Sequence, residues 1–120
     1  MRQVFAHDAV LAMEPDDDAA APGAAITMAV CGHWEHEPPC PLAPHHTAAE
    51  RDGDLVRLRV LFAADPGDEP EVRRRIDDAL ARSELETPDG AVARWRLVST
   101  EVATVRPDEG EHGQRLVDSP

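Results

Sequence analysis

The sequence contains no lysine and no tyrosine, and it is poor in other aromatic residues. All twelve basic residues are arginine, against 24 acidic residues, so the formal net charge is −12. Nucleic acids and anionic membrane surfaces bind positively charged protein surfaces, so the composition argues against both as partners. With only two Trp and two Phe in 120 residues, the core is expected to consist of Val, Leu, Ile and Ala.

Long apolar runs and the features of a secretory signal are also missing. The longest weakly polar stretch, residues 19–32, is too short and too rich in Ala to span a bilayer. The first 18 residues contain one Arg and no sustained apolar run. We therefore expect a cytoplasmic protein. In that compartment thiols stay reduced, so a disulfide between Cys31 and Cys40 is not expected.

Strand-like segments account for most of the ordered sequence. Apolar residues alternate with other residues in several short runs, and this period of two is typical of a strand with one buried face. The predicted strands are residues 4–13, 24–34, 54–62 and 91–105.

One segment, residues 65–83, has the apolar spacing of a helix. Asp68 and Glu71 form a capping-box-like pattern, and Pro70 falls in the first turn, where its missing N–H costs little. The sequence thus predicts an α+β domain over residues 1–105. It would have one mostly antiparallel sheet of about four strands, in the order β-β-β-α-β, with one helix packed on one face.

Two stretches lack this periodicity. Residues 106–120 are polar and rich in Gly and Pro, and we expect a mostly disordered tail. Residues 33–53 would form a loop of about twenty residues, which is unusually long for a compact domain and typical of a functional segment. Four prolines restrict its backbone, so it has less conformational entropy to lose on ordering.

The stretch from residue 31 to residue 46 holds both cysteines and four of the six histidines. Imidazole nitrogen and thiolate sulfur are the usual donors for Zn²⁺, which binds four of them in a tetrahedron. The favoured ligands are His33, His36, Cys40 and His45. Cys31 and His46 are the two in reserve. The same donors would also suit Cu²⁺ or Ni²⁺. A metal here would be mainly structural or regulatory, because it would hold a loop that has few apolar residues to bury.

Two other functions are compatible with the sequence. The first is an interaction module or homodimer that uses an Arg-bearing sheet face. Its basic residues would be Arg57, Arg59, Arg94 and Arg96, provided that their two strands are neighbours. The second is a small enzyme with a Cys–His pair or a metal-bound water. We expect a structural role for His7 and assign none to His112.

Overall fold

The computed structural model describes residues 1–31, 43–86 and 90–118, with the side chain of Cys31 left out. Within these residues no helix is both long and apolar enough to cross a membrane. The elements, in chain order, are β1 (Gln3–Ala12), α1 (Ala21–Cys31), β2 (His45–Asp52), β3 (Leu55–Ala64), α2 (Glu69–Ala81), β4 (Glu84–Glu86), β5 (Val92–Arg94), β6 (Arg96–Ala103), the 3-10 helix η1 (Pro107–Glu109) and α3 (Gly110–Val117).

The main sheet has four strands in the order β2-β3-β1-β6, and each neighbouring pair is antiparallel. Strands β4 and β5 form a separate two-stranded ribbon. Because β3 lies between β1 and β2, the chain has the split β-α-β topology of ferredoxin-like folds. The predicted α+β class and four-stranded antiparallel sheet are therefore confirmed. This topology hosts many unrelated functions, so it does not indicate one here.

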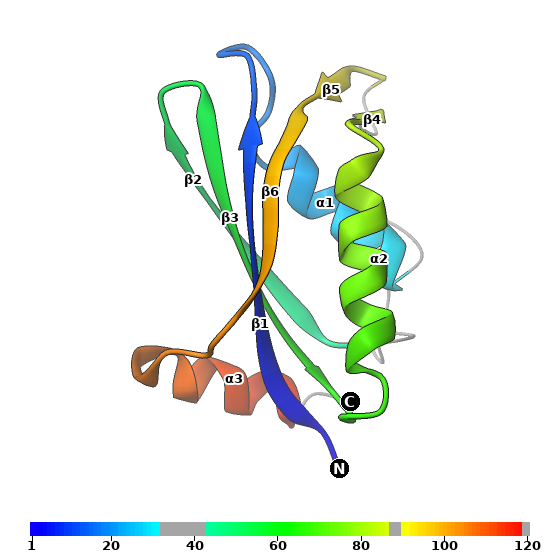
Figure 1. Cartoon of the computed structure of the whole chain (residues 1–120), viewed down its shortest axis with the longest axis vertical. Helices are drawn as coiled ribbons and strands as arrows, with labels where there is room; N and C mark the ends of the chain where they lie inside the picture. Colours follow the sequence, from blue (N-terminus) through cyan, green and yellow to red (C-terminus); the bar gives the residue numbers. More distant parts are fainter. Residues whose placement is uncertain (32–42, 87–89, 119–120) are drawn as a thin grey trace.

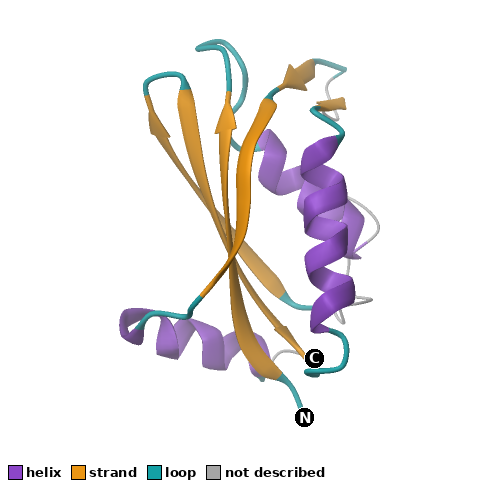
Figure 2. Ribbon diagram, viewed as in Figure 1, coloured by secondary structure: helices purple, strands orange, loops and turns teal. Residues whose placement is uncertain are grey.

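Helices cover both faces of the sheet (Figures 1 and 2). Helices α1 and α2 lie on one side and α3 lies on the other. The larger core fills the space beneath α1 and α2; its largest fully buried side chains include Leu11, Ile26, Phe62, Ile76 and Leu80. A smaller core lies beneath α3 and consists of Ala6, Leu61, Ala63 and Leu116.

The segment predicted as a strand over 24–34 is instead helical over residues 24–31, which belong to α1, and residues 32–34 lie outside the described part of the chain. Nearly every side chain in it is apolar, so the same residues fit both the alternation of a strand and the periodicity of a helix. Its Ala content favours the helix. Its buried residues Ala21, Ala25, Ile26 and Val30 repeat with helical spacing. Just before the helix, the Asp18 side chain accepts a hydrogen bond from the N–H of Ala20 at 2.9 Å, which stabilises the turn that leads into α1.

The predicted loop over 33–53 is also shorter than expected, because residues 45–52 form strand β2. This strand pairs with β3 through a tight hairpin, and Gly53 at its turn has a positive φ of 62°. Asp-Gly is a strong hairpin signal, and it identifies the turn that the loop prediction overlooked. The β-β-β-α-β order is thus replaced by β-α-β-β-α-β in the main sheet.

The C-terminal segment differs most from its prediction. Residues 107–117 form η1 and α3 where a disordered tail was expected. The helix is held by a few apolar contacts: Leu116 is buried, and a Cβ added to Gly113 would lie 2.9 Å from Val4.

Three smaller differences between the predicted and the observed elements occur elsewhere. The strand over 91–105 is divided at Trp95, the helix over 65–83 begins at Glu69, and the Asp68 side chain makes no capping hydrogen bond.

If α3 packs on the sheet, Leu116→Ala should lower the free energy of unfolding by about 2–3 kcal/mol, because it removes a buried side chain and leaves a cavity. Urea unfolding followed by circular dichroism measures the change. Gln114→Ala is the matched control on the exposed side of the same helix, and it should alter the free energy by less than about 0.5 kcal/mol. Equal, small effects of both substitutions would mean that the C-terminal segment does not dock.

Candidate functional site

The predicted metal donors fall in two groups. His33, His36 and Cys40 lie outside the described residues, and of Cys31 only the backbone, at the end of α1, is described. Their role as ligands stays a prediction. His45 and His46 are the first two residues of strand β2. Among the residues that the structure describes, no three His, Cys, Asp or Glu side chains are grouped to hold a metal ion.

His45 is on the side of the sheet that faces α1. Its Nδ1 lies 3.1 Å from the carbonyl oxygen of Ala43, and its Nε2 lies 3.0 Å from Oγ1 of Thr27 in α1. A carbonyl only accepts, so Nδ1 carries the proton and Nε2 presents a lone pair. The Thr27 hydroxyl is also within 3.2 Å of the Gly23 carbonyl. The Thr27 hydroxyl, which has one proton, thus lies within hydrogen-bonding distance of two acceptors.

His46 is on the opposite face, as the next residue of a strand must be. It pairs with Leu61 of β3, and its ring centre lies 4.5 Å from that of His112 in α3. The structure therefore does not bring His45 and His46 to one centre. His112, to which the sequence assigned no role, is the residue that His46 meets.

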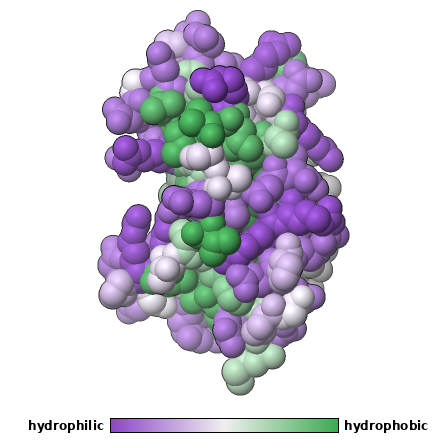
Figure 3. All heavy atoms as spheres, in the orientation of Figure 1, coloured by the Kyte–Doolittle hydropathy of each residue, from purple (hydrophilic) through white to green (hydrophobic). Residues whose placement is uncertain are grey.

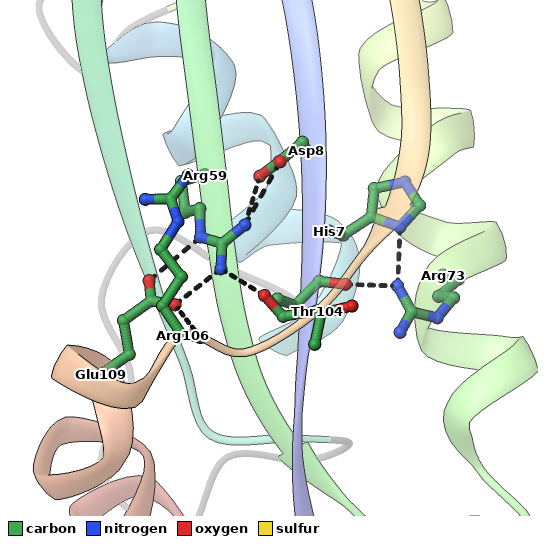
Figure 4. A network of polar contacts seen from close by, with 8 residues as sticks. His7, Asp8, Arg59, Arg73, Thr104, Arg106 and Glu109 are labelled. Atoms are coloured by element: carbon green, nitrogen blue, oxygen red, sulfur yellow. Dashed lines mark hydrogen bonds and ion pairs between the residues drawn. The ribbon is translucent and has the colours of Figure 1, made fainter.

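A second polar cluster surrounds His7 on β1, which is buried with 3% exposure. Its Nδ1 lies 2.9 Å from a guanidinium nitrogen of Arg73 in α2 (Figure 4), and its Nε2 lies 3.0 Å from Oδ1 of Asp77 and 2.7 Å from Oγ1 of Thr100. The Thr100 hydroxyl in turn donates to Asp77 at 2.7 Å. This cluster links β1, α2 and β6.

Although it contains a hydroxyl, an imidazole and a carboxylate, the His7 cluster is not arranged as a catalytic triad. In a triad the carboxylate binds one ring nitrogen and the other accepts the nucleophile's proton. Here Asp77 and Thr100 share Nε2, while Arg73 donates to Nδ1. Nε2 must then carry the ring proton, so neither nitrogen can accept another from Thr100. The cluster fits the structural role expected for His7.

The third cluster lies on the α3 side and is built around Arg59 of β3 (Figure 4). Its guanidinium donates to both carboxylate oxygens of Glu109, at 3.0 and 2.6 Å, and to Asp8 at 3.0 Å. It also donates to the carbonyl of Thr104 at 2.8 Å. The Arg59 guanidinium lowers the pKa of Glu109 to about 2, and this effect outweighs burial, which raises the pKa. The backbone N–H of Arg106 lowers the pKa further.

The Arg-bearing face predicted from sequence is not continuous. Strand β1 separates β3, which holds Arg57 and Arg59, from β6, which begins with Arg96. Arg94 lies in the small ribbon and pairs with Glu84. The prediction required the two strands to be neighbours, and they are not.

A hollow of about 620 Å³ lies next to η1, on the face of the sheet that carries α3. In Figure 3 the outline of the molecule is indented on this side, between the β2–β3 hairpin and α3. The lining is mixed in charge; its ionisable residues are Asp8, Glu50, Arg57, Arg59, Glu101, Arg106 and Glu109. Of the three lining arginines, Arg57 and Arg106 are exposed, whereas Arg59 is held in ion pairs with Asp8 and Glu109.

Comparison with known proteins gives no match, either among protein-family models or among curated proteins. Because the topology is shared by proteins of many functions, a function has to be argued from the side chains described above.

The low pKa of Glu109 should make the free energy of unfolding depend on pH. Its pKa in the folded protein, about 2, lies below the ordinary value of about 4.3. A depressed carboxyl pKa stabilises the fold above the ordinary value, and this contribution is lost as the pH falls from about 4.5 towards 2. Glu109→Gln should therefore lower the free energy of unfolding at pH 7 by about 2–3 kcal/mol. In urea titrations between pH 7 and 2.5, its difference from the wild type should shrink over that window.

Glu71 provides the matched control, because Arg74 and Arg75 also lower its pKa to about 2. Its side chain is 37% exposed, against 16% for Glu109. Solvent screens an exposed ion pair, so Glu71→Gln should cost clearly less than Glu109→Gln. A difference between Glu109→Gln and the wild type that stays constant from pH 7 to pH 2.5 would contradict the assignment.

Proposed function

We propose that the protein binds one transition-metal ion, with Zn²⁺ the first choice, through donors of the stretch from residue 31 to residue 46. The observation that supports this most directly is the contact between Thr27 and His45. It joins the helix before the donor-bearing segment to the strand after it.

The two ends of that segment are held close together. Thr27 lies one helical turn before Cys31, a rise of about 6 Å along the axis, and its hydroxyl is 3.0 Å from His45. The last turn of α1 is fixed in addition by Arg75, which donates to the carbonyl of Ala29 at 3.2 Å. His33, His36 and Cys40 fall between these anchored ends in sequence, so they lie within a short chain length of His45.

The hydrogen bonds of His45 suit a metal ligand. Metal-bound histidines usually donate the N–H of the other ring nitrogen to a carbonyl or carboxylate, which fixes the tautomer and the ring orientation. His45 donates from Nδ1 to Ala43, so Nε2, which lies 3.0 Å from the Thr27 hydroxyl in this structure, is the nitrogen that would bind the ion in place of that contact. The proposed set is therefore His33, His36, Cys40 and His45, with Cys31 as the alternative donor. His46 is not in it, because it faces the other side of the sheet.

The ion would act mainly on stability. A metal that binds the folded chain and not the unfolded chain stabilises the fold by mass action. Its ligands come from the connection between α1 and β2, so binding would tie the edge strand of the sheet to the helical layer.

The test is elemental analysis of protein purified without a polyhistidine tag, combined with melting curves. We expect about one equivalent of metal and a lower melting temperature after chelation. Cys40→Ser and His36→Ala should each lose the metal, while His46→Ala, one residue from a proposed ligand, should keep it. Wild-type protein that holds no stoichiometric metal and does not change its melting temperature with added Zn²⁺ would refute the proposal.

The hollow beside Arg57 supports a second candidate, a homodimer. Its acidic and basic lining residues are mixed, which suits a self-complementary contact across a twofold axis. If two copies meet there, Arg57→Glu should shift the mass measured by light scattering from dimer to monomer without changing metal content. Wild-type protein that is monomeric at about 100 μM would exclude a dimer with the micromolar affinity of ordinary interfaces.

A further inference from the structure

Two histidines from distant parts of the chain meet on the α3 side of the sheet. His46 is the second residue of β2 and His112 is the third residue of α3. Their ring centres are 4.5 Å apart, and the ring planes are inclined by 58°. They are not stacked face to face, and they belong to none of the polar clusters described above.

Neighbouring contacts fix the backbone on both sides of this pair. His46 is registered against Leu61 by the pairing of β2 with β3. His112 lies between Glu109, which binds Arg59 through both carboxylate oxygens, and Gly113, whose close approach to Val4 seats the helix. The fold thus fixes the two backbone positions that carry these rings. His46 is exposed, so its ring can turn within that constraint.

The ring spacing is nearer to one coordination geometry than to another. An imidazole nitrogen binds a transition metal at about 2.1 Å, which places the ring centre about 3.2 Å from the ion. Two imidazoles about 90° apart, as at neighbouring corners of a square plane or an octahedron, have ring centres about 4.5 Å apart. A tetrahedral angle gives about 5.2 Å. The observed 4.5 Å is nearer to the first geometry, which Cu²⁺ and Ni²⁺ prefer.

We propose that His46 and His112 form a two-histidine site for an exchangeable divalent transition-metal ion, Cu²⁺ or Ni²⁺ in preference to Zn²⁺. The bound ion would link α3 to β2. Among the described residues no third His, Cys, Asp or Glu completes a ligand group, so water fills the remaining positions and the ion exchanges readily. The site goes beyond the proposed loop metal: it lies on the other face of the sheet and shares none of its ligands.

The test uses full-length protein in which Cys31→Ser, His33→Ala, His36→Ala, Cys40→Ser and His45→Ala remove the proposed loop donors. Added NiCl₂ should raise the melting temperature by about 4 °C or more once its concentration is ten times the Kd. Either His46→Ala or His112→Ala should weaken Ni²⁺ binding at least about tenfold, because the second imidazole no longer acts within the same molecule. Gln114→Ala, an exposed position on the same helix as His112 and the matched control, should leave Ni²⁺ binding unchanged. With CuCl₂, electron paramagnetic resonance should report two equatorial nitrogens, and fewer in either single variant.

Three results would overturn the proposed two-histidine site. They are no response of the melting temperature to Ni²⁺, an equal response in the host and in both single variants, and a loss of binding in Gln114→Ala as large as in His46→Ala. Both single variants are first checked for native circular dichroism, and His46→Gln and His112→Gln replace any that does not fold. The loop donors are absent throughout, so failure of the loop-metal proposal does not affect this outcome.

Discussion

Successive side chains of a strand face opposite sides of a sheet, and in this protein that constraint decides which polar groups can meet. On β1, His7 faces α2 and joins Arg73 and Asp77, while its neighbour Asp8 faces the α3 side and binds Arg59. On β2, His45 faces α1 and His46 faces α3. Two adjacent pairs of residues thus supply separate polar clusters on the two faces.

The clusters also determine how the outer layers are held. A buried imidazole costs free energy unless its nitrogens are hydrogen-bonded, and both nitrogens of His7 have partners. Arg73 adds a hydrogen bond to the carbonyl of Ala6 at 2.7 Å and lies 5.2 Å from the ring centre of Phe62. Helix α2 is consequently anchored by polar contacts as well as by its apolar stripe. Helix α3 buries far less apolar surface, so the link between Arg59 and Glu109 matters more to it.

The sequence predicted the elements whose pattern was unambiguous. The strand at 54–62 and the helix at 65–83 have clear periodicity, and both are present as β3 and α2. The described part of the strand predicted at 24–34, residues 24–31, is helical. A run of small apolar residues satisfies both periodicities, so tertiary packing decides between them. Likewise β2 is short, polar and mostly exposed, so hydrophobic patterning does not detect it, although Asp52-Gly53 marked its turn.

The candidate sites were less predictable for a related reason. The clustering of His and Cys in the sequence identified the stretch from 31 to 46. It did not show which side of the sheet each donor faces, because that depends on the register of the strand. His112 shows the limit most clearly: it is 66 positions from His46 in the chain, and only the docking of α3 brings the two rings together. A signal for that docking was present in the apolar pair Leu116 and Val117, which the polar composition of the segment obscured.

Both proposed metal sites involve β2, and the sheet order gives a physical reason why ligands there would have an effect. Strand β2 is an edge strand that pairs only with β3, and most of its side chains are exposed. Edge strands have one ladder of hydrogen bonds instead of two and are the least restrained part of a sheet. An ion at His45 would tie β2 to the α1 layer, and an ion at His46 would tie it to α3. Because stabilisation by a ligand requires that the ligand be lost on unfolding, the strand that separates most easily from the sheet is the place where a bound ion most directly opposes local opening.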